Sequence, residues 1–255
     1  MKPFWKKEKE TVQGDLSEKS AIPDDAPFFD YLFRFEDGEE HRFKIHLHPE
    51  TLLYLSQEPL SGDEWTSLES HRCENCPLDA AQHPHCPLAL CIEGLVKEFR
   101  EKFSYEHADI TVNTRERTYF KKTTMQKGVS SIMGILMVSG GCPIMAKLRP
   151  MVRFHLPFST ILETTFRTTS TYLLGQFFLQ KGGGKPESFT FEGLIEIYKN
   201  VNMVNKGMSK RIRSMAGKDA SVNALVILDI FAIDIPLSID DQIGELEPFF
   251  SPYFE

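Results

Sequence analysis

The stretch FFDYLFRFEDGEEHRFKIHL, residues 28–47, decides the fold of the first half of the chain. Apolar residues at every second position share one face of an extended strand, here Phe29, Tyr31, Phe33 and Phe35 in the first run and Phe43, Ile45 and Leu47 in the second. Asp37-Gly38, between the runs, is typical of a tight turn. The stretch therefore predicts an antiparallel hairpin with one buried face.

Further elements of the first half follow from the same kind of pattern. We expect a short strand at Glu64–Ser70 and a second strand pair at Asp109–Thr114 and Arg117–Thr124. Between them, a helix beginning at Pro87 places an apolar stripe on one side, formed by Leu88, Ile92, Leu95, Phe99 and Phe103. These elements indicate a small α+β unit.

From about residue 126 the patterns are helical. Thr160 with Glu163 forms a capping box that starts a helix running to about Gln180. Thr190–Ala216 has an amphipathic pattern, with an apolar stripe of Val201, Val204, Met208, Ile212 and Met215. Asp219–Asp234 is apolar on nearly every side, which predicts a central buried helix, and Ser238 with Asp241 caps a last short one.

The predicted fold class is therefore α+β, with a small antiparallel sheet and a zinc-stabilised loop and helix, followed by an all-α region. We expect residues 1–26 to form a disordered charged arm, because they are poor in aliphatic side chains. Residues 27–125 would form the α+β zinc-binding module, and residues 126–255 a helical domain.

Composition excludes several classes of protein. The net charge of −7 argues against a general nucleic-acid binder, which usually has a basic surface. The N-terminus lacks the apolar core of a signal peptide, and the most apolar runs are too short or too interrupted to span a bilayer. Three of the five cysteines lie within fourteen residues, which favours metal binding in a reducing compartment over a disulfide scaffold. We expect a cytoplasmic protein.

The stretch CENCPLDAAQHPHCP, residues 73–87, contains the metal ligands that we predict. Cys73, Cys76, His83 and Cys86 give the pattern C-x2-C-x6-H-x2-C, whose ligand types and spacing match a closed structural zinc site. His85 is the alternative histidine, but it directly precedes Cys86, and adjacent side chains tend to point apart. A closed site leaves no position for substrate, so its role would be to stabilise the fold.

Three other interpretations stay open for these cysteines. Cys142, which like Cys86 precedes a proline, could supply a distant fourth thiolate to an iron–sulfur cluster, since Cys-Pro occurs in ferredoxin sequences. Cys73 and Cys76 could form a redox dithiol, or the cysteines could be free thiols without a metal. Cys91 lies on the apolar helix stripe and is expected in the core.

A second candidate site lies in a segment from Arg117 to Leu162 that has seven basic residues and no Asp or Glu. Arg149, Arg153 and His155, with Arg167 on the next helix, could form a cationic pocket for a phosphate or carboxylate. Cys142 follows two glycines and would lie near a helix N-terminus, which could lower its pKa and make it a nucleophile.

Charge pairing within the chain is the alternative explanation of this basic segment. Glu163 with Arg167 is an ordinary i,i+4 pair, and the last 37 residues hold eight acids and no Lys or Arg. Asp229 could be a buried counter-ion. A further set of cations is expected to form a solvated helix face or to meet an acidic protein partner: Lys199, Lys206, Lys210, Arg211 and Arg213.

The motifs CENCPL, HPHCPL and LRPMVRFHLPF resemble those of an uncharacterised bacterial protein family of unknown function. The resemblance implies a bacterial cytosolic protein and carries no activity or site. Our leading hypothesis is a zinc-stabilised binding or regulatory module, and the competing one is an enzyme acting on a small anionic molecule. A scaffold that uses the Phe-rich hairpin or the basic helix to meet a partner is the third.

Overall fold

The computed structural model describes residues 21–57, 61–184, 190–214, 223, 241 and 243–254. Residues 1–20 of the predicted arm lie outside this range. So does the predicted helix Asp219–Asp234, apart from Asn223, and with it Asp229. The fold is α+β, with a small antiparallel sheet followed by helices, as predicted.

Four strands form one antiparallel sheet in the order β2-β1-β3-β4. They are β1 (Phe28–Phe35), β2 (Glu40–His46), β3 (His107–Asn113) and β4 (Thr118–Thr124). In the central strand, Phe33 pairs with His41 on one side and with Ile110 on the other. Both predicted hairpins are confirmed, because period-two alternation and a short turn fix their register locally.

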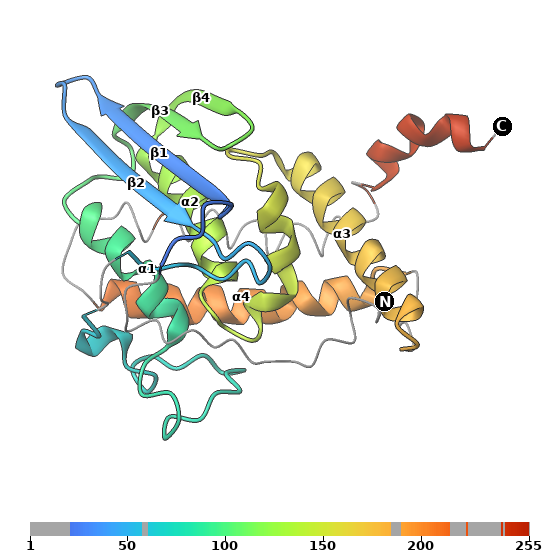
Figure 1. The fold of residues 1–255 in the computed structure, drawn as a ribbon, viewed down its shortest axis with the longest axis horizontal. Coiled ribbons are helices and arrows are strands. Elements are labelled where there is room, and N and C mark those ends of the chain that lie inside the picture. The colour runs from blue at the N-terminus through green and yellow to red at the C-terminus, as the bar shows by residue number, and fades with distance from the viewer. Residues whose placement is uncertain are drawn as a thin grey trace.

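One face of the sheet is covered by helices α1 (Pro87–Glu98) and α2 (Met125–Ser139), which lie below it in Figure 1. The alternating residues that the sequence assigns to one face of β1 are buried on this side, and Tyr31 and Phe33 are completely inaccessible to solvent. Gly128 lets α2 approach closely: a Cβ atom there would lie 2.4 Å from Cε1 of Phe33 and 2.5 Å from Cδ1 of Ile110. The helix backbone therefore rests directly on the sheet.

The close approach of α2 to the sheet predicts that the same substitution, glycine to alanine, has opposite effects on stability at two positions. Gly128→Ala is expected to lower the free energy of unfolding by about 1–3 kcal/mol, because the added methyl group overpacks the core. Gly175→Ala, in a helix and with open space around its Cα, should raise that free energy by up to about 1 kcal/mol through helix propensity. Urea denaturation of both variants tests the prediction, and changes of the same sign would contradict it.

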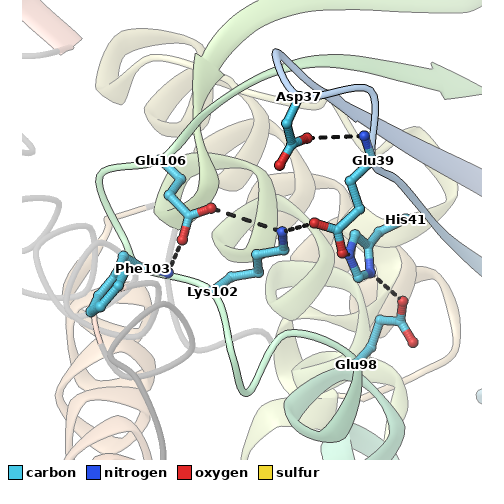
Figure 2. Close-up of polar contacts among 7 residues, drawn as sticks. All are labelled: Asp37, Glu39, His41, Glu98, Lys102, Phe103 and Glu106. Atoms are coloured by element: carbon cyan, nitrogen blue, oxygen red, sulfur yellow. Dashed lines mark hydrogen bonds and ion pairs between the residues drawn. The ribbon is translucent and has the colours of Figure 1, made fainter.

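Charged residues connect the β1–β2 turn to the end of α1 (Figure 2). His41 on β2 lies between two carboxylates, 2.6 Å from Oε1 of Glu98 and 2.7 Å from Oε1 of Glu39. Lys102, which is nearly buried, also donates to Glu39, and its Nζ lies 3.9 Å from Glu106. These contacts hold the turn end of the hairpin against the segment that follows α1.

The remaining elements differ from the sequence-based expectation at one point. Residues Glu64–Thr66 form the 3-10 helix η2, and only a single bridge, Ser67 with His85, follows it, so the predicted strand Glu64–Ser70 is wrong. That short apolar run has no neighbouring strand to complete a ladder. Trp65 and Leu68 are buried nonetheless.

The second half is helical, as predicted. It comprises η3 (Met145–Phe154, a 3-10 helix), α3 (Ile161–Lys181), α4 (Glu192–Arg213) and η4 (Glu247–Tyr253). The capping box of Thr160 with Glu163 is present at the start of α3. Helix α4 runs across the lower part of the molecule in Figure 1 and contacts both η2 and η3.

A single apolar cluster runs from the sheet through α1 and α2 to α4. It includes Leu88, Ile92, Leu95 and Phe99 of the predicted α1 stripe, while Phe103 lies beyond the helix and is partly exposed. Cys91 is buried in the same cluster, as predicted. Both candidate sites lie at the boundary where helix α4 meets the sheet-bearing half.

Candidate functional site: a cationic cavity beside a group of thiols

A cavity of about 380 Å³ lies between α2, η3, the start of α3 and α4. Its volume is within the range of small-molecule sites, about 300–1,000 Å³. Three cations line it, Lys121 of β4, Lys127 of α2 and Arg167 of α3, and none of the described residues that line it is Asp or Glu. The cavity therefore combines an apolar wall with unbalanced positive charge.

Arg167 is the cation best placed to hold an anion. Its Nη2 donates to the carbonyl oxygen of Met151 at 3.0 Å, and its Nε is buried and has no hydrogen-bond partner among the described residues. Glu163, one turn earlier, favours the charged form of Arg167, but the ion pairs of the described residues do not include these two, and Glu163 hydrogen-bonds to Thr160. Burial lowers the pKa of Arg167, which remains charged because an arginine pKa starts far above neutrality.

His155 also lines the cavity, but it is held in a neutral form. Its Nε2 lies 3.2 Å from the hydroxyls of both Tyr31 and Ser131, which are 2.8 Å from each other. Part of the ring remains accessible in the cavity, yet burial, together with the charge of Arg167, lowers its pKa to about 3. His155 therefore contributes a hydrogen-bonding nitrogen without charge at neutral pH.

The other two arginines of the predicted pocket do not line this cavity. Nε of Arg149 donates to the carbonyl oxygen of Val138 at 3.1 Å. Arg153 is exposed and lies 3.3 Å from Glu116 in a surface ion pair. The structure thus brings His155 and Arg167 together, and Lys121 and Lys127 join them instead of Arg149 and Arg153.

Cys142 does not have the activated thiol that the sequence suggested. The backbone N–H groups of Ile144 and Met145 do lower its pKa, as a helix N-terminus should. Burial acts in the opposite direction and is the larger effect, so the pKa of Cys142 rises to about 11. The thiol is therefore protonated at neutral pH, and it is not among the cavity-lining residues.

Of the predicted zinc ligands, Cys73 and Cys76 form a turn beside α4 that is closed by a backbone hydrogen bond of 3.0 Å. The groups whose charges act on Cys73 are Cys76, Cys86, Cys142 and Arg211, and His83 is not among them. His85 instead places Nδ1 at 2.8 Å from the hydroxyl of Thr66. In the part of the chain that the structure describes, no group of three or more His, Cys, Asp or Glu side chains is arranged to hold a metal ion.

Arg211 is the residue that sequence reasoning placed wrongly. It is only 1% exposed, whereas the helical charge pattern assigned it to a solvated face with Lys210 and Arg213. Its guanidinium donates to the carbonyl oxygens of Trp65, Ser67 and Leu68, from a segment more than 140 positions earlier in the chain. Arg211 lies on the same helix face as the apolar residues Val204, Met208 and Ile212. This spacing was the signal in the sequence that indicates its burial.

The fold and these sites define an α+β protein with a ligand-sized cationic cavity. The chain belongs to the family described as a domain of unknown function (DUF6901), which matches residues 29–251. This agrees with the resemblance to an uncharacterised family. The match does not test the individual motifs on which that resemblance rests. Comparisons with curated proteins and with solved structures found no match.

Among the described residues, no helix combines the length and the apolar character that crossing a membrane requires.

Proposed function

We propose that the protein binds a small amphipathic anion, an organic carboxylate with an apolar body, in the cavity between α2, η3, α3 and α4. The observation that carries this proposal is Arg167, whose buried Nε has no partner among the described residues and which lines a cavity whose described wall contains no carboxylate. A guanidinium presents donors in a fixed plane that matches the two oxygens of a carboxylate. Lys121 and Lys127 add positive charge at the same cavity.

The apolar body of the ligand is inferred from the rest of the wall. Met137, Met145 and Met151 line the cavity together with aliphatic residues such as Val152 and Leu156. Methionine side chains are flexible and polarizable, so such a wall can adapt to hydrocarbon or aromatic groups. This combination of a charged end and an adaptable apolar wall favours an amphipathic acid over a fully polar phosphate compound.

Binding is favoured over catalysis by the state of the two candidate catalytic groups. A general base works best when its pKa is near the operating pH, and the pKa of His155 is about 3. The thiol of Cys142 lies outside the cavity wall and is protonated. The proposal therefore follows the binding hypothesis, because neither of the two candidate groups is in a state or position suited to catalysis at this cavity.

Titration calorimetry with a saturated fatty carboxylate and the primary alcohol of the same chain length tests the proposal. The carboxylate should bind more tightly than the alcohol. Arg167→Met should weaken carboxylate binding roughly tenfold to a hundredfold, the value of a hydrogen bond to a charged group, and leave alcohol binding unchanged.

Arg153→Met is the matched control, because Arg153 is two residues from His155 in the chain but pairs with Glu116 on the surface. It should bind the carboxylate as the parent protein does. The melting temperatures of both variants show whether a loss of binding comes from a loss of folding. Arg167→Lys, which retains the charge, serves the same purpose. Equal affinity for the acid and the alcohol, or an equal loss in Arg153→Met, would contradict the proposal, as would no binding of either ligand.

A further inference from the structure

Three cysteines of residues 73–86 and the distant Cys142 lie near one another beside α4. Cys73 packs against this helix, with its sulfur 4.0 Å from the carbonyl oxygen of Val204, and a Cβ atom on Gly207 would lie 2.6 Å from that sulfur. The loop around Cys76 is held to the same helix by Asn75, whose amide donates to the backbone oxygen of Asn200 at 3.1 Å. The first two thiols are therefore fixed against α4.

The other two thiols come from near the starts of two helices, α1 and η3. Cys86 is the N-cap of α1, and Cys142 precedes η3. A Cβ atom on Gly141 would lie 3.6 Å from Cβ of Pro87, so the residues next to the two cysteines are in contact distance. The charges of Cys76, Cys86 and Cys142 all act on Cys73, which agrees with a common neighbourhood for the four side chains.

A buried cation, Arg211, lies at this common region and has no carboxylate partner among the described residues. Its Nε also has no hydrogen-bond partner in the described part of the chain, and its charge acts on Cys73 and Cys86. Burying an unpaired guanidinium is costly, so a buried arginine normally has an anionic counterpart. Thiolates bound to a metal centre would supply that negative charge.

Backbone groups at two of the four positions favour the same charge state. The backbone N–H groups of Leu88 and Ala89 hydrogen-bond the sulfur of Cys86, and those of Ile144 and Met145 hydrogen-bond the sulfur of Cys142. When a metal binds and the thiols lose their protons, these N–H groups would face thiolate sulfurs.

The ligand set and the sequence around it favour a cluster. All four candidate ligands are cysteines, the usual ligand set of a four-iron cluster. Three of them, Cys76, Cys86 and Cys142, directly precede a proline, as a cluster-binding cysteine does in ferredoxin sequences. These observations favour an iron–sulfur cluster over the predicted zinc site.

We propose that Cys73, Cys76, Cys86 and Cys142 hold a four-iron, four-sulfur cluster, with Arg211 as its buried counter-ion. Each cysteine loses its proton and binds one iron of the cluster through sulfur. His83 is not a ligand in this site. The proposal replaces the histidine of the predicted zinc site by a thiol that is 56 positions after Cys86 in the chain.

To test the proposal, the full chain is produced with added iron and cysteine and purified without oxygen. Its content of iron, acid-labile sulfide and zinc is then measured, together with its visible absorption. We expect a brown protein with about four irons and four sulfides per chain. Cys142→Ser should lose most of the iron and the absorption, whereas His83→Ala should retain both. Cys91→Ser is the matched control, because Cys91 is buried and its sulfur donates to the carbonyl oxygen of Leu136, a bond that serine can keep.

Several results would overturn the proposal. A colourless protein with about one zinc and no sulfide would exclude the cluster. Iron retained by Cys142→Ser, or lost from His83→Ala, would exclude this set of ligands. If Cys142→Ser does not fold, the sulfide content of the parent protein and the iron content of His83→Ala still test the proposal.

Discussion

Replacing Arg211 by methionine is expected to lower the free energy of unfolding of the iron-loaded protein by about 3–5 kcal/mol, the usual cost of removing one partner from a buried charge pair. The guanidinium is 1% exposed and donates to three backbone carbonyl oxygens, which would lose their donor. This prediction depends on the proposed cluster, because only a bound anionic centre makes Arg211 one half of a pair.

The metal-free protein provides the contrast. There the substitution stabilises the fold by removing an unpaired buried charge and destabilises it by removing the hydrogen bonds of that charge. Because these effects oppose each other, we expect a smaller loss in the free energy of unfolding. Lys210→Met is the control, since Lys210 is the exposed neighbour on the same helix and should change the free energy by less than about 0.5 kcal/mol. Chemical denaturation of each variant, with and without iron, measures the difference. An equal loss in both states would show that Arg211 has only a structural role.

Phe33→Ala is expected to lower the free energy of unfolding by about 3–5 kcal/mol, whatever ligand the protein carries. Phe33 is completely buried at the centre of the sheet, and its ring centroid lies 4.9 Å from that of Phe99. Truncation would leave a cavity that neither β1 nor α2 can fill, because both are fixed by contacts along their length.

Phe120→Ala is the control for this second prediction. Phe120 belongs to the same sheet and is 65% exposed, so its loss removes little buried surface. Urea denaturation of both variants measures the difference. Comparable losses would mean that the central strand is not the main contributor to stability.

The parts of the fold that could be predicted are those that depend on neighbouring residues. Alternation in residues 28–47 predicts the hairpin, and Thr160 with Glu163 predicts the start of α3, because a strand face and a helix cap are defined within a few positions. The strand predicted at Glu64–Ser70 failed for the opposite reason. A strand needs a partner, and none is available beside that segment in the described structure.

The candidate sites depend on contacts that sequence spacing does not contain. Arg211 follows the charge pattern of a solvated helix, and only the carbonyl groups of residues 65–68 explain its burial. Cys142 is 56 positions from Cys86 in the chain, and its approach to Cys86 depends on the turn at Gly141, which lies against Pro87. Similarly, of the four basic candidates in residues 149–167, two line the cavity, whereas Arg149 bonds to the carbonyl oxygen of Val138 and Arg153 pairs with Glu116.

The contact of α4 with the cysteine loop has a consequence for biosynthesis. Gly207 and Asn200 contact the loop and Arg211 contacts the segment before it, yet all three are translated long after Cys73, Cys76, Cys86 and Cys142. A nascent chain shorter than about 213 residues cannot complete these contacts, so its thiols lack the cover that α4 provides in the finished protein. Delivery of the proposed cluster would therefore have a natural interval, between the emergence of the last cysteine from the ribosome and the docking of α4.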